Sequence, residues 1–387
     1  MIVINAEIHT MDNESRIIEK GYIIISNGKI SDLGKMDDLH DRDDIIFDAE
    51  GKAVYPGFID AHTHLGMFED SLTFEGDDGN EDTEPVTPQL RAIDGSNPMD
   101  GYFPQALEAG ITTVLISPGS TNPVAGQIAA IKTKGKSIDK MIIREPAGIK
   151  CALGENPKSV YNDKEQTPVT RMAVASLIRE TLHKAEKYYN DKIKWKSDPD
   201  NYDEPDYDIR YEAFIPVFKK EIPLHFHTHR ADDIFTAGRI CREFGISYII
   251  VHGTDAHLIC EELDDLCLGV LSGPFLTDRS KPELKNLTPA SPGIISRSLP
   301  VAIITDHPEI PIQYLTMCAA IAVREGMNRE DALRAITIEP ARICGIADRV
   351  GSVEKGKDAD MAIFDGDPLD IMCKPSAVII NGDLIRS

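Results

Sequence analysis

At 387 residues with 42% hydrophobic content, the chain can bury the core of one large barrel, or of a barrel with a smaller satellite domain. Its formal net charge of −23 disfavours nucleic acid and anionic membranes as partners, and no apolar run approaches the roughly 20 residues that a membrane helix needs. Seven cysteines without a CxxC pair indicate neither a disulfide framework nor a thiolate zinc site, so we expect a soluble protein of the reducing cytoplasm.

Both ends of the chain are rich in short alternating strands. Residues 1–53 contain strand-like runs separated by the turn dipeptides Asn27-Gly28 and Glu50-Gly51. The residues from 350 onward have the same character. We therefore predict a small composite β-sandwich built from residues 1–53 and 345–387, with a different domain formed by residues 54–344.

The middle of the chain alternates between two kinds of segment. A first strand-like run ends in the segment FIDAHTH. Further strand-like runs are predicted at residues 111–118, 221–227, 246–252, 267–273 and 301–306. Helix-like segments are predicted at residues 170–189, 231–245 and 314–326. Such alternation predicts an α/β fold with a parallel sheet, and the (β/α)8 TIM barrel is its commonest closed form at this length.

Two stretches match no regular element. Residues 69–98 are acidic and rich in turn formers, which predicts a long loop that is either functional or a solvated surface. Residues 184–213 carry the only tryptophan among Lys, Asp and Tyr, and we interpret them as a peripheral insertion.

Chemically active side chains follow several of the predicted strands. His62 and His64 end the first strand, where residues i and i+2 point to the same face. His227, His252 and Asp306 each come at the end of a later apolar run. Because the carboxyl ends of barrel strands meet at one mouth, these five groups form a predicted ligand set for a divalent cation.

Lys150 ends the segment EPAGIK, at the end of another predicted strand. A lysine in such a place normally pairs with a carboxylate or extends its amine to water, but its neutral amine can also be carboxylated and bridge two metals. Glu155 in CALGENP is the competing anionic bridge. Both alternatives remain open at this point.

Together these residues resemble the amidohydrolase superfamily over nearly the whole chain. FIDAHTH is similar to the first-strand motif of the superfamily, His227 and His252 to its fifth- and sixth-strand ligands, and Asp306 to its eighth-strand aspartate. The segments PARICGIADRVGS and VGSVEKGKDADMAIFDGDP resemble its carboxyl-terminal signature. Within the superfamily, HTHRADDI is similar to the imidazolonepropionase-related and prolidase-like branch, in which a second histidine, here His229, follows the strand-five ligand.

The resemblance implies a hydrolase that cleaves a C–N bond of an amide, cyclic amide or dipeptide-like substrate with a metal-activated hydroxide. Asp306 would act as general base and then general acid, with His252 and His229 as further catalytic groups. The implied metal, zinc first, is held as one or two ions by His62, His64, Lys150, His227, His252 and Asp306. The partner is then a small-molecule substrate, and a homo-oligomer is expected.

Cationic residues in the predicted loops are candidates for binding a substrate carboxylate. Arg91 follows the acidic loop, Arg230 follows strand five, and Arg279 and Lys281 lie after strand seven. His307, next to Asp306, is a candidate for orienting a ligand or for donating to the substrate.

Three other functions are alternatives to hydrolysis of an amide bond. An imidazolonepropionase-like ring hydrolase and a mononuclear deaminase are the alternatives among enzymes, although HFHTHRADD lacks the glutamate that deaminases carry after the strand-five histidine. A non-catalytic scaffold is disfavoured because scaffold relatives lose metal ligands and this sequence keeps them.

Overall fold

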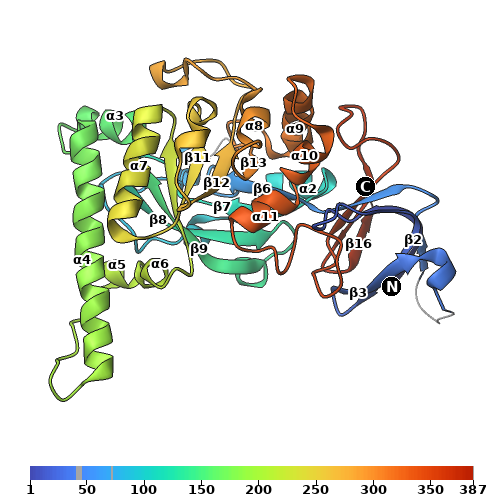
Figure 1. Ribbon diagram of the computed structural model, residues 1–387, viewed down its shortest axis with the longest axis horizontal. Coiled ribbons are helices and arrows are strands. Elements are labelled where there is room, and N and C mark those ends of the chain that lie inside the picture. Colours follow the sequence, from blue (N-terminus) through green and yellow to red (C-terminus); the bar gives the residue numbers. More distant parts are fainter. Residues whose placement is uncertain (41–45, 71–72, 387) are drawn as a thin grey trace.

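The computed structural model describes residues 1–40, 46–70 and 73–386 (Figure 1). Its strands form two eight-stranded sheets, one from the middle of the chain and one from both termini. The two sheets lie side by side in Figure 1, with the terminal sheet on the right and the long helix α4 on the far left. Among the described residues, no helix is both long and apolar enough to cross a membrane.

The central sheet keeps its strands in chain order from first to last: β6 (Phe58–Thr63), β7 (Ile111–Ile116), β8 (Val124–Lys132), β9 (Ile142–Ala152), β10 (Leu224–Thr228), β11 (Tyr248–His252), β12 (Cys267–Ser272) and β13 (Val301–Ile303). Seven strands run parallel, but β8 is antiparallel to both β7 and β9. The purely alternating barrel predicted from the sequence is therefore corrected at β8. Residues 117–123 and 133–141 are too short for a crossover helix, so β7, β8 and β9 must reverse direction.

The first and last strands of the central sheet are joined through a side chain. The buried carboxylate of Asp60 in β6 accepts hydrogen bonds from the backbone N (3.2 Å) and the Oγ1 (2.6 Å) of Thr305, just past β13. Burial raises the pKa of Asp60 to about 7. This contact nearly closes the sheet, and it brings the end of β6 next to Asp306.

Helices cover the outside of the central sheet: α1 (Ala92–Gly95), α2 (Tyr102–Glu108), α3 (Glu155–Asp163), α4 (Arg171–Ser197), α5 (Ile209–Glu212), α6 (Ile215–Phe218), α7 (Ala231–Phe244), α8 (Ser291–Ile295), α9 (Leu315–Arg324), α10 (Arg329–Arg334) and α11 (Ile338–Ile343). One buried apolar cluster lies between the strands and these helices, including Phe226 and Ile240. A second cluster fills the interior of the sheet, including Ile59 and Val251. Strand residues therefore alternate between two apolar surroundings, as in a packed barrel.

Helix α4 shows why the insertion predicted at residues 184–213 is only partly correct. Thr170 caps its amino end, because its Oγ1 accepts a hydrogen bond from the backbone N of Ala173 (3.1 Å). Its buried residues recur every three or four positions, from Val174 to Tyr188, against the barrel. The helix then runs on to Ser197, and its carboxyl end extends beyond the body of the molecule, as Figure 1 shows.

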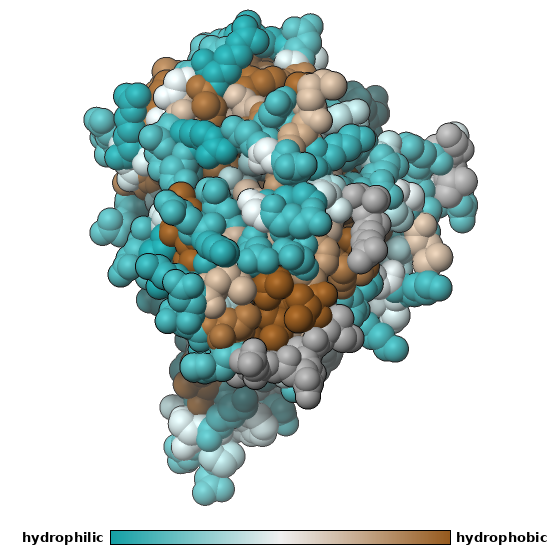
Figure 2. All heavy atoms as spheres, turned by 90° about the vertical axis from the view of Figure 1, so that its right-hand side faces the viewer, coloured by the Kyte–Doolittle hydropathy of each residue, from teal (hydrophilic) through white to brown (hydrophobic). Residues whose placement is uncertain are grey.

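The strands of both termini pair in one sheet, with the order β16 (Asp383–Arg386), β15 (Pro375–Ile380), β14 (Met361–Phe364), β5 (Ala53–Pro56), β1 (Ile2–His9), β2 (Ile17–Ser26) and β3 (Lys29–Lys35), while β4 (Ile46–Asp48) pairs with β1. A single hydrogen-bonded path joins them, so the expected two-sheet sandwich is not confirmed. Figure 2 faces this end of the molecule, where an apolar patch lies within a mostly hydrophilic surface. The domain limits at residues 53/54 and 344/345 stay a prediction.

A buried charge cluster ties the terminal unit to the central sheet. Lys132, the last residue of β8, is 2% exposed, and its Nζ pairs with Asp360 and with Asp358 Oδ2 (3.0 Å). Asp358 also accepts from Lys29 (3.0 Å) and Arg349 (2.7 Å). Both aspartates belong to the DAD portion of the carboxyl-terminal signature, so the signature performs a structural task here.

The acidic loop predicted at residues 69–98 is mostly irregular, as expected, although residues 73–76 form a short 3-10 helix and α1 lies near its end. Residues 71–72 of this loop lie outside the described residues, as do residues 41–45 of the strand-rich segment predicted at residues 1–53 and Ser387.

Candidate active site

His62, His64 and Asp306 meet at the carboxyl end of the central sheet. Asp306 Oδ1 lies 3.3 Å from His62 Nε2 and 3.5 Å from His64 Nε2. Asp306 has a φ of 55°, in the left-handed region that an aspartate adopts only when its surroundings hold it there. The three side chains offer ligand atoms that all lie within 4.8 Å of one another.

His227, His229 and His252 form a second group beside the first. Their ligand atoms also lie within 4.8 Å of one another, and the rings of His227 and His252 have centroids 4.6 Å apart. His252 has a φ of 70°, the same unusual backbone region as Asp306. The strands therefore bring together the five ligands predicted at strand ends, with His229 added to them.

Hydrogen bonds on the far side of three rings fix how these rings face the cavity. The Nδ1 of His64 lies 2.7 Å from the carbonyl oxygen of Ser117, and the Nδ1 of His252 lies 2.8 Å from that of Gly273. His229 makes the corresponding contact with Thr254 Oγ1 at 2.8 Å. A carbonyl partner at Nδ1 leaves the Nε2 of His64 and of His252 as the free acceptor, as in most metal-bound histidines.

Lys150 lies on β9, two residues before its end, and its side chain is fully buried in the same cluster. Its Nζ is 3.3 Å from His62 Nε2. Burial lowers the pKa of Lys150 to about 8, against the attraction of Asp306. Carboxylation requires the neutral amine, and this lowered pKa makes the neutral form more accessible near pH 7 than it is for an exposed lysine. Glu155, the competing bridge, begins α3 and does not line the cavity.

The charge states of these groups suit a divalent cation. Burial lowers the pKa of His62, His227 and His229 well below the ordinary value and also lowers that of His252, which favours the neutral form of these rings. Burial opposes ionisation of Asp306, but its contacts with His252, His62 and His64 hold the pKa of Asp306 well below its usual range. Its Oδ1 is buried and has no hydrogen-bond partner among the described residues. Neutral imidazoles around an orphaned carboxylate oxygen fit a bound metal ion.

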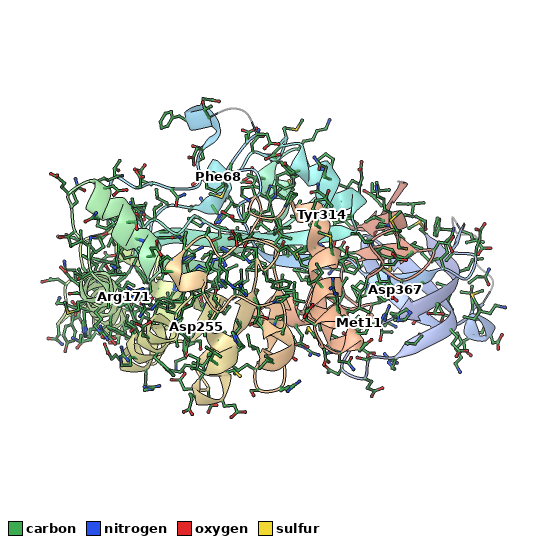
Figure 3. The ribbon with its side chains drawn as sticks, turned by 90° about the horizontal axis from the view of Figure 1, so that it is seen from above. Met11, Phe68, Arg171, Asp255, Tyr314 and Asp367 are labelled. Atoms are coloured by element: carbon green, nitrogen blue, oxygen red, sulfur yellow. The ribbon has the colours of Figure 1, made fainter. Side chains whose placement is uncertain are left out.

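The two groups share a cavity of about 440 Å³, a size that suits a small-molecule ligand. Phe68, labelled in Figure 3, packs edge-on against His64 at one side, with ring centroids 5.5 Å apart. The strand-end pattern missed several polar lining residues: Asn156 lies in the first turn of α3, and the others lie on loops, namely Asn80, Ser120, Thr121, Thr277, Ser280 and Glu309. Only the position of these loops after predicted strands could have pointed to them.

The cationic residues predicted to bind substrate occupy different places. Arg91 pairs with Glu145 (2.8 Å), Arg230 with Asp232 (2.8 Å), and Arg279 donates to the carbonyl oxygen of Leu287 (2.7 Å). None of these three arginines lines the cavity, because each has a local partner that holds it elsewhere. Their predicted role in substrate binding therefore finds no support in this geometry. Lys281, by contrast, lines the cavity.

His307 is buried against the ring of Tyr102, with centroids 4.4 Å apart. Its carbonyl oxygen accepts the backbone N–H of His64 (2.8 Å), and it does not line the cavity. This contact fits the predicted role of orienting a ligand better than the role of contacting substrate.

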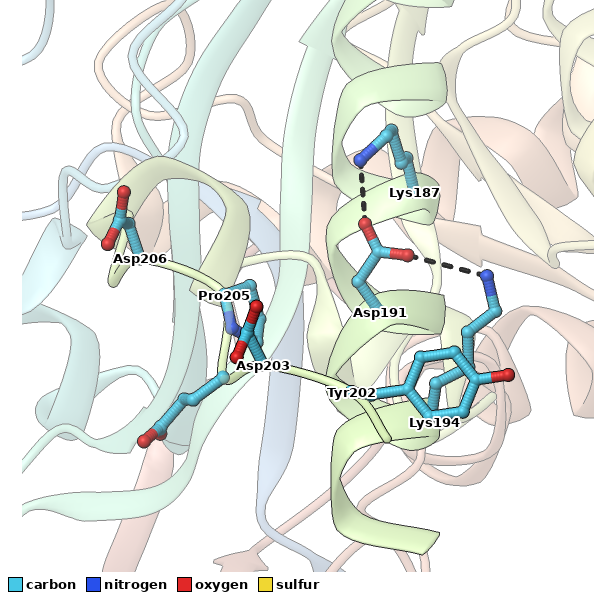
Figure 4. Close-up of a pocket in the computed structure, with 8 residues that line it drawn as sticks. Lys187, Asp191, Lys194, Tyr202, Asp203, Pro205 and Asp206 are labelled. Carbon is cyan, nitrogen blue, oxygen red and sulfur yellow. Dashed lines mark hydrogen bonds and ion pairs between the residues drawn. The ribbon is translucent and has the colours of Figure 1, made fainter. Parts of the chain in front are cut away.

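Another hollow of about 360 Å³ lies near the carboxyl end of α4 (Figure 4). Its lysines are already paired within it, because Asp191 accepts from Lys187 (2.6 Å) and Lys194 (3.5 Å). It contains no group of histidines and carries no catalytic candidate.

Comparisons with known proteins identify the family to which the chain belongs. The profile of the Amidohydrolase family matches residues 53–385. A crystal structure of an amidohydrolase from Thermotoga maritima MSB8 superposes with a TM-score of 0.94 at 41% identity, and covers 100% of both chains. The Amidohydrolase tasK of Hapsidospora irregularis is 28% identical over 88% of this chain, which spans 37% of that relative's length.

A shorter similarity extends to the 5-methylthioadenosine/S-adenosylhomocysteine deaminase of Bacillus anthracis, which is 42% identical over 65 residues. This match covers 16% of the chain and 15% of the deaminase. The family profile, in contrast, spans both the ligand-bearing strand ends and the carboxyl-terminal signature. The chain belongs to the amidohydrolase family.

Proposed function

We propose that this protein is a metal-dependent hydrolase that cleaves the C–N bond of an amide, cyclic amide or dipeptide-like substrate in the central cavity. The observation that carries the proposal is the meeting of two ligand groups around Asp306, whose buried Oδ1 lacks a hydrogen-bond partner. A structural cluster would satisfy that oxygen with a protein donor.

Two ions are the arrangement that we propose. His62, His64 and Asp306 would hold one, and His227 and His252 the other, with carboxylated Lys150 as a further ligand. Imidazole-rich ligation favours zinc, although manganese and iron accept the same donors. When bound, the metal supplies a Lewis acid that polarises a carbonyl and lowers the pKa of water.

Asp306 is the proposed general base and then general acid. Its ionised carboxylate would accept the proton of the attacking water at an oxygen that no protein donor occupies, and deliver the proton to the leaving nitrogen. His229, which lines the cavity and stacks on His252, would donate a hydrogen bond to the substrate carbonyl. Both histidines are held from behind, so they need little reorganisation during the reaction.

A deaminase is the second candidate, favoured by the local similarity to the Bacillus anthracis enzyme. If the protein released ammonia from an aminated heterocycle and did not hydrolyse amides, the deaminase function would replace the proposed amide hydrolase. The cytoplasmic location and the homo-oligomeric state expected from the sequence remain part of the proposal.

Metal removal tests the proposed function directly. Protein purified with zinc should hold about one or two equivalents per chain by elemental analysis. Dialysis against a chelator should lower amide hydrolysis at least about 100-fold, and added zinc should restore it. His62→Ala should lose metal, whereas His183→Ala, which changes an exposed histidine on α4, should keep it. Full activity in metal-free protein would reject the proposal.

A further inference from the structure

Lys281 is the one cationic group at the outer part of the cavity. Of the lysines and arginines in the described chain, only Lys150 and Lys281 line the cavity, and Lys150 is fully buried beside His62. Lys281 lies on the loop between β12 and α8 and is partly exposed. It is therefore the lysine that an arriving substrate can reach.

The ammonium group of Lys281 makes no ion pair with a described carboxylate. Its Nζ donates to the side-chain oxygen of Asn156 at 2.7 Å, while the buried Glu283, two residues further along the loop, attracts it from beyond ion-pair distance. The chain has 64 acidic and 41 basic residues, so acidic partners are abundant. A lysine that faces a cavity and contacts only a neutral amide keeps its charge available for a ligand.

The backbone around Lys281 is anchored. Glu283, 2% exposed, accepts the backbone N–H of Glu155 at the start of α3 (3.1 Å). Leu284, the residue after Glu283, also lines the cavity. The residues that follow Lys281 are thus fixed to the barrel, and its stem starts from a defined place.

Asn156 connects Lys281 to the proposed metal ligands. Its Nδ2 donates to Ser120 Oγ at 2.8 Å and lies 3.3 Å from His227 Nε2. Lys281 Nζ is therefore separated from the ring of His227 by a single side-chain amide. If Lys281 held an anionic group of the substrate, only a short part of the substrate would separate that group from a bond that reacts beside His227.

We propose that Lys281, supported by Asn156, is the recognition site for a substrate carboxylate, so that the substrate is an N-acyl amino acid or a dipeptide. This inference rests on the proposed hydrolase function and specifies its substrate class. Hydroxyl groups of Ser120, Thr277 and Ser280 line the same region and can donate to a second carboxylate oxygen. With a net charge of −23, the protein repels anions at long range, so a local cation decides whether a carboxylate stays bound.

The test compares free acids with their amides. A panel of N-acetyl amino acids and dipeptides, each paired with its C-terminal carboxamide, is assayed on the zinc-loaded enzyme. The wild type should hydrolyse the acids with kcat/KM at least about tenfold above the amides, the effect of one charge-assisted hydrogen bond. Lys281→Met should remove this preference mainly through KM, and Lys281→Arg should restore part of it.

A lysine on the same loop provides the control. Lys285→Met changes an exposed residue that does not line the cavity and should keep the full preference for acids. An unchanged preference in Lys281→Met, or a wild type that hydrolyses amides but prefers the carboxamides, overturns the inference. A metal-loaded wild type that hydrolyses none of the acids overturns it as well, whereas a protein without metal overturns the proposed function.

Discussion

Asp306→Asn should lower the hydrolysis rate by about 10²–10⁴-fold, the range for loss of a general acid or base. The amide keeps one oxygen for the cation but cannot accept the proton of water. Because asparagine adopts the left-handed backbone region as readily as aspartate, the φ of 55° at this position is preserved. The loss should therefore come from chemistry and leave the fold intact.

Circular dichroism and zinc analysis of the variant should match the wild type, while turnover of the amide panel falls. Asp278→Asn removes an exposed carboxylate on the loop after β12 and serves as the control, with unchanged rates expected. If Asp306→Asn hydrolysed amides at the wild-type rate, Asp306 would not be the base.

Lys132→Met should lower the free energy of unfolding by about 3–5 kcal/mol, the cost of breaking a buried ion pair from one side. The methionine fills a similar volume but leaves Asp358 and Asp360 close together without Lys132. Asp360 is buried, and burial already raises its pKa. Urea unfolding followed by circular dichroism measures the change.

Lys134→Met is the matched control. Lys134 lies two residues after Lys132, and it pairs with the exposed carboxylate of Asp383 (2.9 Å). Exposed pairs contribute about 0–1 kcal/mol, so this variant should stay close to the wild type. Lys132→Met/Asp360→Asn should recover stability, since asparagine is neutral and its oxygen can still accept the backbone N–H of Asn381. Equal losses in the two single lysine variants would contradict the role of the cluster.

The strand pattern predicted most of the central sheet because its parallel strands are buried on both faces and appear as continuous apolar runs. It missed β8, whose residues include Gly126, Gln127 and Lys132. The length of α4 was also underestimated, since its second half is charged and carries no apolar stripe to mark it. An exposed helix that leaves the core gives a weak periodic signal.

The sequence by itself determined the chemical character of the site, because histidines and an aspartate placed at strand ends reach one mouth in any barrel with this strand order. Only the tertiary structure decided which cations reach the cavity. Arg91, Arg230 and Arg279 contact partners away from the cavity, while Lys281 lines the cavity and donates to Asn156. Strand periodicity is a local property of the backbone, whereas the partner of a long flexible side chain depends on which loops the fold brings together.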